Sequence, residues 1–310
     1  MNGIVIIDKP KGMTSHEVVQ DVKKALGAEK AGHTGTLDPL ATGVLPVCIN
    51  EATKLSQFIS AENKEYRATM LLGVKTDTYD VEGKVIADEK PLVGREEIEK
   101  AMRNLVGKRK QAPPSFSAVK YHGKPLYKWA RQGIAVDSSP RPVEIFEMSL
   151  EKVDLPYVTF RVGCSKGTYI RSLCFELGEA LGCGACLAAL RRIKSGRYTE
   201  EKALSFAGIG KKEKREALAA HLIPMADALP DLAAIHVDDL LAEKMGQGYQ
   251  PVIGSLLADH IPSLAKGDMV RFIAGGRLVA IAEALHPSAG WSILDRQEQA
   301  VKIIRVFNVD

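Results

Sequence analysis

The stretch AGHTGTLDPLATGVLPV, from Ala31 to Val47, surrounds one acid, Asp38, with three glycines, two prolines and three threonines. It leads into the run VLPVCI, whose apolar residues predict a buried strand over Val44–Ile49. Glycines permit backbone conformations that other residues avoid, and prolines restrict the backbone. The composition therefore predicts a stiff loop that holds a single carboxylate next to a core strand.

Three interpretations of this loop compete. In the first, Asp38 caps a short helix whose first residue is Pro39, and the loop is only a buried turn. In the second, the glycines bind phosphate, but GHTGTLDPLATG lacks the lysine and the strand–loop–helix order of known nucleotide loops. In the third, Asp38 is a catalytic carboxylate on a rigid loop. The loop residues alone do not decide between the first and the third.

The surrounding sequence predicts strands and helices in an irregular order. Ile4–Ile7 is a short apolar run typical of a buried strand, and Thr14 with Glu17 forms a capping box for a helix that ends at Gly27. Because no regular alternation of strand and helix recurs, we expect an α+β fold with a mixed sheet. The other expected elements are short or long helices over Thr53–Ser60, Arg95–Val106 and Thr168–Leu181, strands over Tyr66–Leu72, Val143–Val153 and Tyr157–Cys164, and an exposed excursion over Gly107–Pro114.

The C-terminal part of the chain changes character after Pro224–Pro230, where glycines and short apolar segments become frequent. Paired short strands joined by glycine turns predict a small β-barrel domain over residues 235–310, after a large domain over residues 1–230. The expected strands are Asp268–Ala274, Arg277–Ala284 and Ala300–Val306, the first two joined by Gly275-Gly276.

Bulk properties exclude several classes of protein. The chain has 310 residues, of which 45% are hydrophobic and 26% charged, as in ordinary folded proteins. No run approaches the roughly 18 apolar residues of a membrane span, and the N-terminus does not resemble a secretory signal, so we expect a cytoplasmic protein. The five cysteines include a Cys183–Cys186 pair without a second pair or nearby histidines. Buried free thiols are therefore expected, and no metal site.

The charge is unevenly distributed. Residues 101–200 contain 17 Lys+Arg and 8 Asp+Glu, a balance of +9, whereas the rest of the chain carries 25 and 30, a balance of −5. A basic middle third on an otherwise slightly acidic chain is typical of a protein with a polyanionic partner, although a solvated surface gives the same count.

Longer motifs carry a resemblance to a known family. GHTGTLDPLATGVLPV, preceded by DKPKGMTS, resembles the TruB family, the bacterial tRNA pseudouridine-55 synthases. The resemblance continues in order through KEYRATMLLGVKTDTYDVEG, PPSFSAVKYHGKPLYKWARQG, CSKGTYIRSLCFELGEALGCGA and LRRIKSG, and so covers residues 1 to about 200. The C-terminal barrel resembles a PUA domain, an RNA-binding module, by its position and strand pattern. These similarities imply a pseudouridine synthase catalytic domain followed by a PUA-like domain.

The resemblance implies an isomerisation. The enzyme breaks the N1–C1′ bond of a uridine, turns the uracil over and rejoins it through C5, which formally requires no cofactor, metal or energy source. Asp38 matches the family carboxylate, which either attacks C1′ or removes the 2′ proton. Arg171 matches the arginine that pairs with this acid, since a buried carboxylate needs a cation to stay ionised. Tyr66 matches the aromatic residue that stacks on the flipped base, and Tyr169 and Leu190 complete the pocket.

Further positions match the family without a catalytic assignment. His33 matches the residue that occupies the RNA stack after the target base leaves it. Lys9 and Pro10 match a motif that buttresses the catalytic loop, and Asp80 matches an acid near the pocket with a supporting role. Where relatives often have histidine, this chain has Cys186.

The expected partner is the T-arm stem-loop of tRNA, with no obligatory protein partner. Phosphate contacts should help to extrude the base. Two other functions stay open: a guide-RNA-dependent synthase of the same fold, and an RNA-folding chaperone. The candidates for contact with the RNA backbone are Lys108, Arg109, Lys110 and Lys120, followed by Lys124, Lys128 and Arg131, with Phe116, Tyr121, Tyr127 and Trp129 between them.

Overall fold

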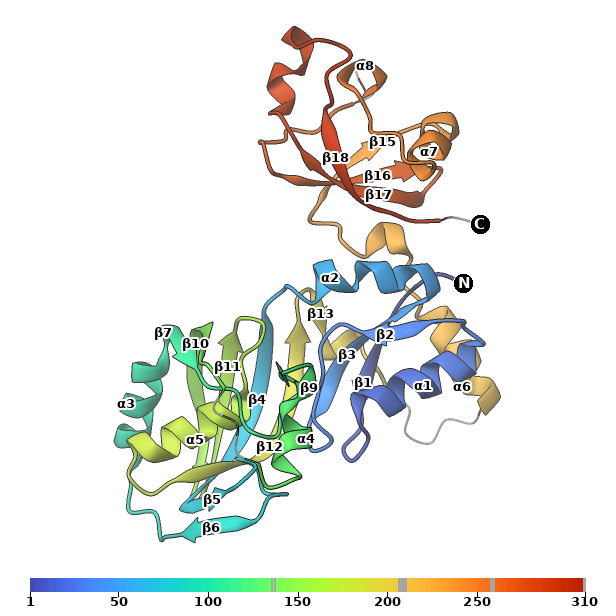
Figure 1. Cartoon of the computed structure of the whole chain (residues 1–310). Helices are drawn as coiled ribbons and strands as arrows, with labels where there is room; N and C mark the ends of the chain where they lie inside the picture. The colour runs from blue at the N-terminus through green and yellow to red at the C-terminus, as the bar shows by residue number, and fades with distance from the viewer. Residues whose placement is uncertain (135, 137, 206–210, 257–259, 309–310) are drawn as a thin grey trace.

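The computed structural model describes residues 1–134, 136, 138–205, 211–256 and 260–308. Figure 1 shows two parts, a large sheet with helices packed against it and a smaller C-terminal sheet. The smaller sheet lies beside the end of the large sheet that carries α2 (Ser56–Ile59). Glu51 joins the two ends of the described chain there, because its amide contacts Asn2 and its carboxylate accepts from the amide of Asn308.

The large sheet is mixed, which confirms the predicted α+β fold. Its strand order is β14-β1-β3-β12-β4-β11-β10-β7, with β2 paired to β3 and β13 paired to β12. The β1–β14 and β3–β12 pairs are parallel and the others are antiparallel. The strands are β1 (Gly3–Lys9), β2 (Ala31–His33), β3 (Thr42–Ile49), β4 (Lys64–Leu72), β7 (Gly107–Gln111), β10 (Arg141–Asp154), β11 (Tyr157–Cys164), β12 (Ala185–Ser195), β13 (Tyr198–Thr199) and β14 (Leu204–Ser205).

Local sequence explains the first helix. In α1 (Ser15–Leu26) the Thr14 side chain accepts from the Glu17 amide while the Glu17 carboxylate accepts from the Thr14 amide, so the predicted capping box is confirmed. Gly27 ends the helix in the left-handed conformation at φ 61°. The remaining helices are α2, α3 (Arg95–Leu105), α4 (Leu126–Ala130), α5 (Ile170–Ala180), α6 (Lys211–Ala220), α7 (Asp239–Gly246) and α8 (Ile253–Leu256), with 3₁₀ turns at Asn50–Leu55, Glu200–Lys202, Met225–Asp227 and Ser288–Ile293. No helix in the described ranges is long and apolar enough to span a membrane.

Two predicted segments differ from the structure. The excursion expected over Gly107–Pro114 is in its first half the edge strand β7, paired to β10. Charged residues are common on edge strands because they discourage pairing with other chains, so the basic composition concealed a strand. The helix expected from Thr168 begins at Ile170, since Tyr169 still has an extended backbone. Two short hairpins complete this part, β5 (Val74–Thr76) with β6 (Val85–Asp88), and β8 (Lys120–Tyr121) with β9 (Lys124–Pro125).

The C-terminal part forms a separate sheet with the order β15-β16-β17-β18. Strand β15 pairs in parallel with β16 and the other pairs are antiparallel. Gly275 and Gly276, both with positive φ, form the predicted turn between β16 and β17. This sheet encloses its own core around the fully buried Trp291. Its strands are β15 (Ala233–His236), β16 (Met269–Ala274), β17 (Arg277–Ala284) and β18 (Val301–Val306), so the sheet begins just before the expected boundary at residue 235.

Strand β1 is buried on both faces. Val5 and Ile7 pack with the helix layer formed by α1, α3 and α5, whereas Ile4 and Ile6 pack on the opposite face. The cluster on that opposite face continues into the C-terminal sheet through Ile273, Leu278, Ile281 and Phe307. The two sheets therefore share one apolar cluster, and we expect them to unfold together.

Ile281→Val tests this shared core. Loss of one buried methylene should lower the free energy of unfolding of the whole chain by about 1 kcal/mol, within a single transition. The measurement is thermal unfolding followed by far-UV circular dichroism and by emission of Trp291 in a Trp129→Phe background. Ile293→Val, at a side chain that is 86% exposed, is the control and should change little. Two separate transitions would show that the sheets unfold independently.

Candidate active site

The loop that carries Asp38 connects β2 to β3, and hydrogen bonds to Gly12 and Ser15 hold it in place. Ser15, the first residue of α1, bonds to Leu37 twice, since its hydroxyl donates to the Leu37 carbonyl at 2.9 Å and accepts from the Leu37 amide at 2.8 Å. The Gly12 amide donates to the Pro39 carbonyl at 2.8 Å. Gly43, at the start of β3, has a φ of +99°, and a Cβ there would lie 2.2 Å from the Arg192 carbonyl. Glycine is thus required where the loop meets the sheet.

The fully buried Lys9 supports the same loop. Its ammonium donates to the carbonyls of Met13 at 2.6 Å, Pro10 at 2.8 Å and Pro39 at 3.4 Å. Burial lowers the pKa of Lys9 to about 8, and the negative charge of Asp38 opposes that fall. The predicted buttress is therefore confirmed for Lys9, which ties the start of α1 to the residue after Asp38.

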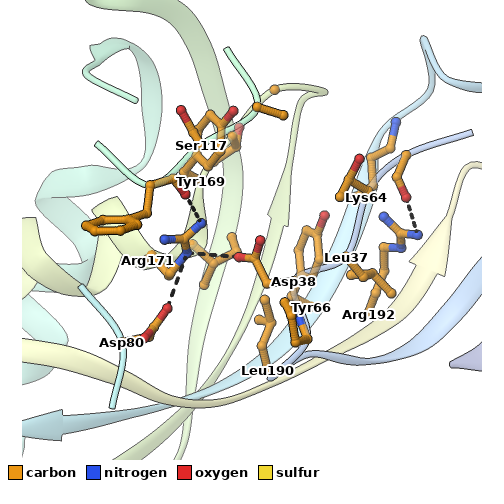
Figure 2. Close-up of a pocket in the computed structure, with 18 of the residues that line it drawn as sticks. Leu37, Asp38, Lys64, Tyr66, Asp80, Ser117, Tyr169, Arg171, Leu190 and Arg192 are labelled. Carbon is orange, nitrogen blue, oxygen red and sulfur yellow. Dashed lines mark hydrogen bonds and ion pairs between the residues drawn. The ribbon is translucent and has the colours of Figure 1, made fainter. Parts of the chain in front are cut away.

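Asp38 and Arg171 form the central ion pair of the site. The Nε of Arg171 lies 2.9 Å from the Asp38 carboxylate and 3.7 Å from that of Asp80. The guanidinium is nearly buried, at 5% exposure, while the Asp38 side chain is 39% exposed. The Nη1 of Arg171 donates to the Thr78 carbonyl at 3.0 Å, and its Nη2 donates to the Phe116 carbonyl at 2.9 Å. One planar group thus orients the acid and joins three chain segments. Figure 2 shows the pairs of Arg171 with Asp38 and Asp80.

An open cavity of about 790 Å³ lies over this pair. Tyr66 and Leu190, each 8% exposed, come from the neighbouring strands β4 and β12 and line the cavity beside Asp38. Burial raises the pKa of the Tyr66 hydroxyl, and the charge of Arg192 opposes that rise. An aromatic side chain and a leucine thus stand opposite a carboxylate in a space large enough for a nucleoside.

Tyr169 lines the cavity just before α5, and a double hydrogen bond fixes its backbone. The Gln111 side chain donates to the Tyr169 carbonyl at 3.1 Å and accepts from its amide at 2.8 Å. Burial raises the pKa of its hydroxyl. Tyr169 therefore joins Asp38, Arg171, Tyr66 and Leu190 in the group that the structure brings together.

Of the remaining sequence-based candidates, Asp80, Phe116, Tyr127 and Arg131 line the cavity, whereas His33 and the basic residues Lys108, Arg109, Lys110 and Lys120 lie outside its lining. His33 lies on β2 immediately before the cavity residue Thr34, and its buried Nδ1 has no hydrogen-bond partner among the described residues. Arg109 is half-buried and pairs with Glu176 at 2.5 Å. Lys108 and Lys110 alternate with Arg109 on β7, so they point to the opposite face of the sheet. Lys120 is exposed, and its segment adjoins the cavity residues Phe116, Ser117 and Ala118.

Sequence reasoning missed two buried cations of the cavity, Arg192 and Lys64. Each stands two residues from a recognised position on the same strand, Leu190 on β12 and Tyr66 on β4, and alternate residues share a face. That two-residue spacing was the signal in the sequence from which both cations could have been placed in the cavity. The five cysteines all lie in the described chain, where they are buried and free, as expected. Within the described residues, no three His, Cys, Asp or Glu side chains form a group that could hold a metal ion.

Two family models match the chain in succession. Residues 23–170 match the N-terminal domain of the TruB family pseudouridylate synthases, and residues 171–230 match the tRNA pseudouridylate synthase B C-terminal domain. The class of protein that fold and site define is therefore that of the pseudouridylate synthases.

Relatives and solved structures agree with this class. The chain is 52% identical to tRNA pseudouridine synthase B of Syntrophus aciditrophicus over 99% of both chains, and 40% identical to that of Geobacter sulfurreducens over 99% of this chain and 100% of the relative. A crystal structure of a Cbf5–Nop10–Gar1 complex matches with a TM-score of 0.72 and 30% identity, covering 99% of this chain and 85% of the other. The chain belongs to the TruB family.

Proposed function

We propose that this protein converts uridine 55 in the T arm of tRNA to pseudouridine, without a cofactor. The observation that carries the proposal is the Asp38 carboxylate, held at 2.9 Å by the buried Arg171 on the wall of an open cavity. The relatives are named tRNA pseudouridine synthase B, and this name supplies the substrate class, which is tRNA. The T arm and position 55 follow from the sequence motifs.

Each cavity residue has a role in this reaction. Asp38 acts at the sugar, either by attacking C1′ or by removing the 2′ proton, while the electron pair of the C1′–N1 bond leaves with the uracil. Arg171 orients Asp38 and keeps a positive charge beside it. Tyr66 stacks on the flipped base, and Leu190 and Tyr169 enclose it. The detached uracil then turns and bonds to C1′ through C5, which breaks the C1′–Asp38 bond or is accompanied by return of the 2′ proton. The proton on C5 leaves and N1 takes up a proton.

RNA binding extrudes the base, which costs a few kcal/mol of unstacking. Phosphate contacts supply this free energy, and Lys120 is the candidate whose segment adjoins the cavity. Arg131 and Lys166 also line the cavity and add positive charge at its rim. His33, next to the loop, takes the place of the base in the RNA stack.

The proposed enzyme acts on tRNA in the cytoplasm without an obligatory protein partner. One matching Cbf5 structure contains Nop10 and Gar1 and another contains Nop10, and those partners belong to Cbf5. A guide-RNA-dependent enzyme is the alternative with the same fold. Conversion of bare tRNA by the purified chain separates the two, because a guide-dependent enzyme would need added guide RNA.

The test is mass-tagged mapping of pseudouridine in a tRNA transcript treated with the purified chain. We expect one tag, at position 55, and no tag in a transcript with cytidine at that position. Tags elsewhere, or none without a guide RNA, would contradict the proposal.

Lys120→Ala tests the phosphate contacts. If the Lys120 ammonium contacts one phosphate, its loss should reduce the slope of log K against log salt by up to about 0.7–0.9. Binding is measured by filter retention of tRNA between low and moderate salt. Lys152→Ala is the control, because Lys152 is 69% exposed but pairs with Asp154 on β10. A slope equal to that of the unmodified protein would assign Lys120 to the solvated surface.

A further inference from the structure

Arg192 is a second arginine beneath the loop that carries Asp38. It is 1% exposed, its Nε donates to the Val44 carbonyl at 2.7 Å, and its Nη2 donates to the Gly35 carbonyl at 3.1 Å. Gly35 precedes Asp38 and Val44 follows it, so the guanidinium holds both limbs of the loop against β12. Figure 2 shows Arg192 and Arg171 on opposite sides of Asp38.

The two neighbouring arginines have carboxylate partners, but Arg192 has none. Arg171 pairs with Asp38 and Asp80, and Arg191 pairs with Asp8 and Glu200. Among the described residues, no carboxylate oxygen lies within 4.0 Å of the Arg192 guanidinium, which donates to the Val44 and Gly35 carbonyls and also interacts with the Tyr66 hydroxyl. A buried charge without a counter-ion is a large burden on stability. Its retention in a core strand indicates a purpose other than packing.

Nearby ionisable groups respond to this charge. Burial and, next, the charge of Arg192 lower the pKa of His33, and the same two causes lower that of Lys64 to about 8. Burial raises the pKa of the Tyr66 hydroxyl, and the Arg192 guanidinium opposes this rise. The wall of the cavity around Tyr66 is therefore positive, in a setting that excludes much of the water that would screen it.

The proposed reaction creates a negative charge next to this wall. When the C1′–N1 bond breaks, its electron pair remains on uracil, which carries one negative charge until C5 bonds to C1′. The C5 proton then leaves and N1 takes up a proton. Tyr66 lies in register with Arg192 on the neighbouring strand, so a base stacked on Tyr66 lies near the guanidinium. Arg171 is already neutralised by two acids.

We propose that Arg192 is a positioning residue that fixes the Asp38 loop and whose uncompensated charge stabilises the detached uracil anion. This inference rests on the proposed function, because it needs a reaction in which uracil leaves C1′. It gives the two buried arginines of the cavity separate roles, Arg171 toward the carboxylate and Arg192 toward the base.

A change of leaving group tests the inference. Fluorine at C5 withdraws electrons and stabilises the uracil anion, so a substrate with 5-fluorouridine at the target needs less help from a cation. Arg192→Met should slow loss of the target nucleoside about 100-fold with uridine and less than 10-fold with 5-fluorouridine, in single-turnover reactions read from nuclease digests by mass spectrometry. Binding of tRNA should stay within about twofold of the unmodified protein. Arg192→Lys, which keeps the charge, should lose less than 10-fold.

The adjacent Arg191→Met is the matched control, because Arg191 pairs with Asp8 and Glu200 and does not line the cavity. It should keep the full rate on both substrates. An equal loss on both substrates in Arg192→Met, or no loss on either, would overturn the inference while the proposed function stands. An inactive unmodified protein would overturn both. If Arg192→Met does not fold, Arg192→Gln gives the same comparison, since it keeps donors for the Val44 and Gly35 carbonyls and removes the charge.

Discussion

Asp38→Asn should reduce pseudouridine formation by about 10⁴-fold or more, roughly 5.5 kcal/mol of transition-state free energy, and leave tRNA binding within about tenfold. The amide has nearly the same shape as the carboxylate, so the loop held by Ser15, Gly12 and Lys9 should stay in place. An amide neither attacks C1′ nor accepts the 2′ proton effectively. Both pathways at the sugar therefore fail, whichever of them the enzyme uses. The measurement is tritium release from C5-labelled uridine in tRNA.

The control is Asp154→Asn, at a side chain that is 70% exposed at the end of β10. It should retain full activity. Retention of more than about 1% activity in Asp38→Asn would contradict the assignment of Asp38. A variant that binds and refolds tRNA but does not isomerise it would also separate an RNA-chaperone activity from the chemistry.

Elements with local signals were predictable from the sequence. The Thr14–Glu17 capping box fixed the start of α1, and Gly27 fixed its end. Strand β4 shows regular alternation, with Tyr66, Ala68, Met70 and Leu72 buried, and was identified from Tyr66 onward. In each case the residues that define the element lie within a few positions of one another, so no knowledge of the tertiary fold was needed.

Elements whose role depends on distant partners were not predictable. The basic segment Gly107–Gln111 becomes a strand only because β10 offers an edge to pair with. The apolar run Ile4–Ile7 predicted a buried strand, but nothing in it showed that the apolar cluster on one of its faces extends into the C-terminal sheet. The boundary near residue 230 was predicted from a change in composition, but one apolar cluster contains residues from both sides of this boundary.

The site shows the same limit. Physical reasoning from the loop left Asp38 undecided between a cap and a catalytic acid, and the pairing with Arg171 came from the family resemblance. The structure brings the two together across the fold at 2.9 Å. Arg192 had no such precedent in the sequence reasoning. Arg192 lies two positions after the pocket residue Leu190 on the same strand. A strand at the surface can also carry a charged residue at this spacing, so the spacing alone does not identify a buried cation.

Arg171→Lys should lower the rate of pseudouridine formation by about 10²–10³-fold, roughly 2.7–4 kcal/mol, although it keeps the positive charge. Arg171 uses three nitrogens on three segments, the Asp38 carboxylate and the carbonyls of Thr78 and Phe116. A lysine ammonium is a compact charge on a flexible stem and cannot span these acceptors in one plane. The Asp38 carboxylate then loses its fixed orientation toward C1′, and two partly buried carbonyls lose their donors.

Stability and activity should respond together in this variant, but for different reasons. Unpaired, partly buried carbonyls should lower the free energy of unfolding by about 1–3 kcal/mol, which thermal unfolding measures. The rate loss should persist in single-turnover reactions at a temperature where the variant is fully folded, since it comes from the orientation of Asp38. The matched control is Arg161→Lys, because Arg161 pairs with Glu151 and its side chain is 42% exposed. This variant should change neither the free energy of unfolding nor the reaction rate appreciably. Activity of Arg171→Lys within tenfold of the unmodified protein would mean that charge beside Asp38 is sufficient and that the planar fork of the arginine is not required for catalysis.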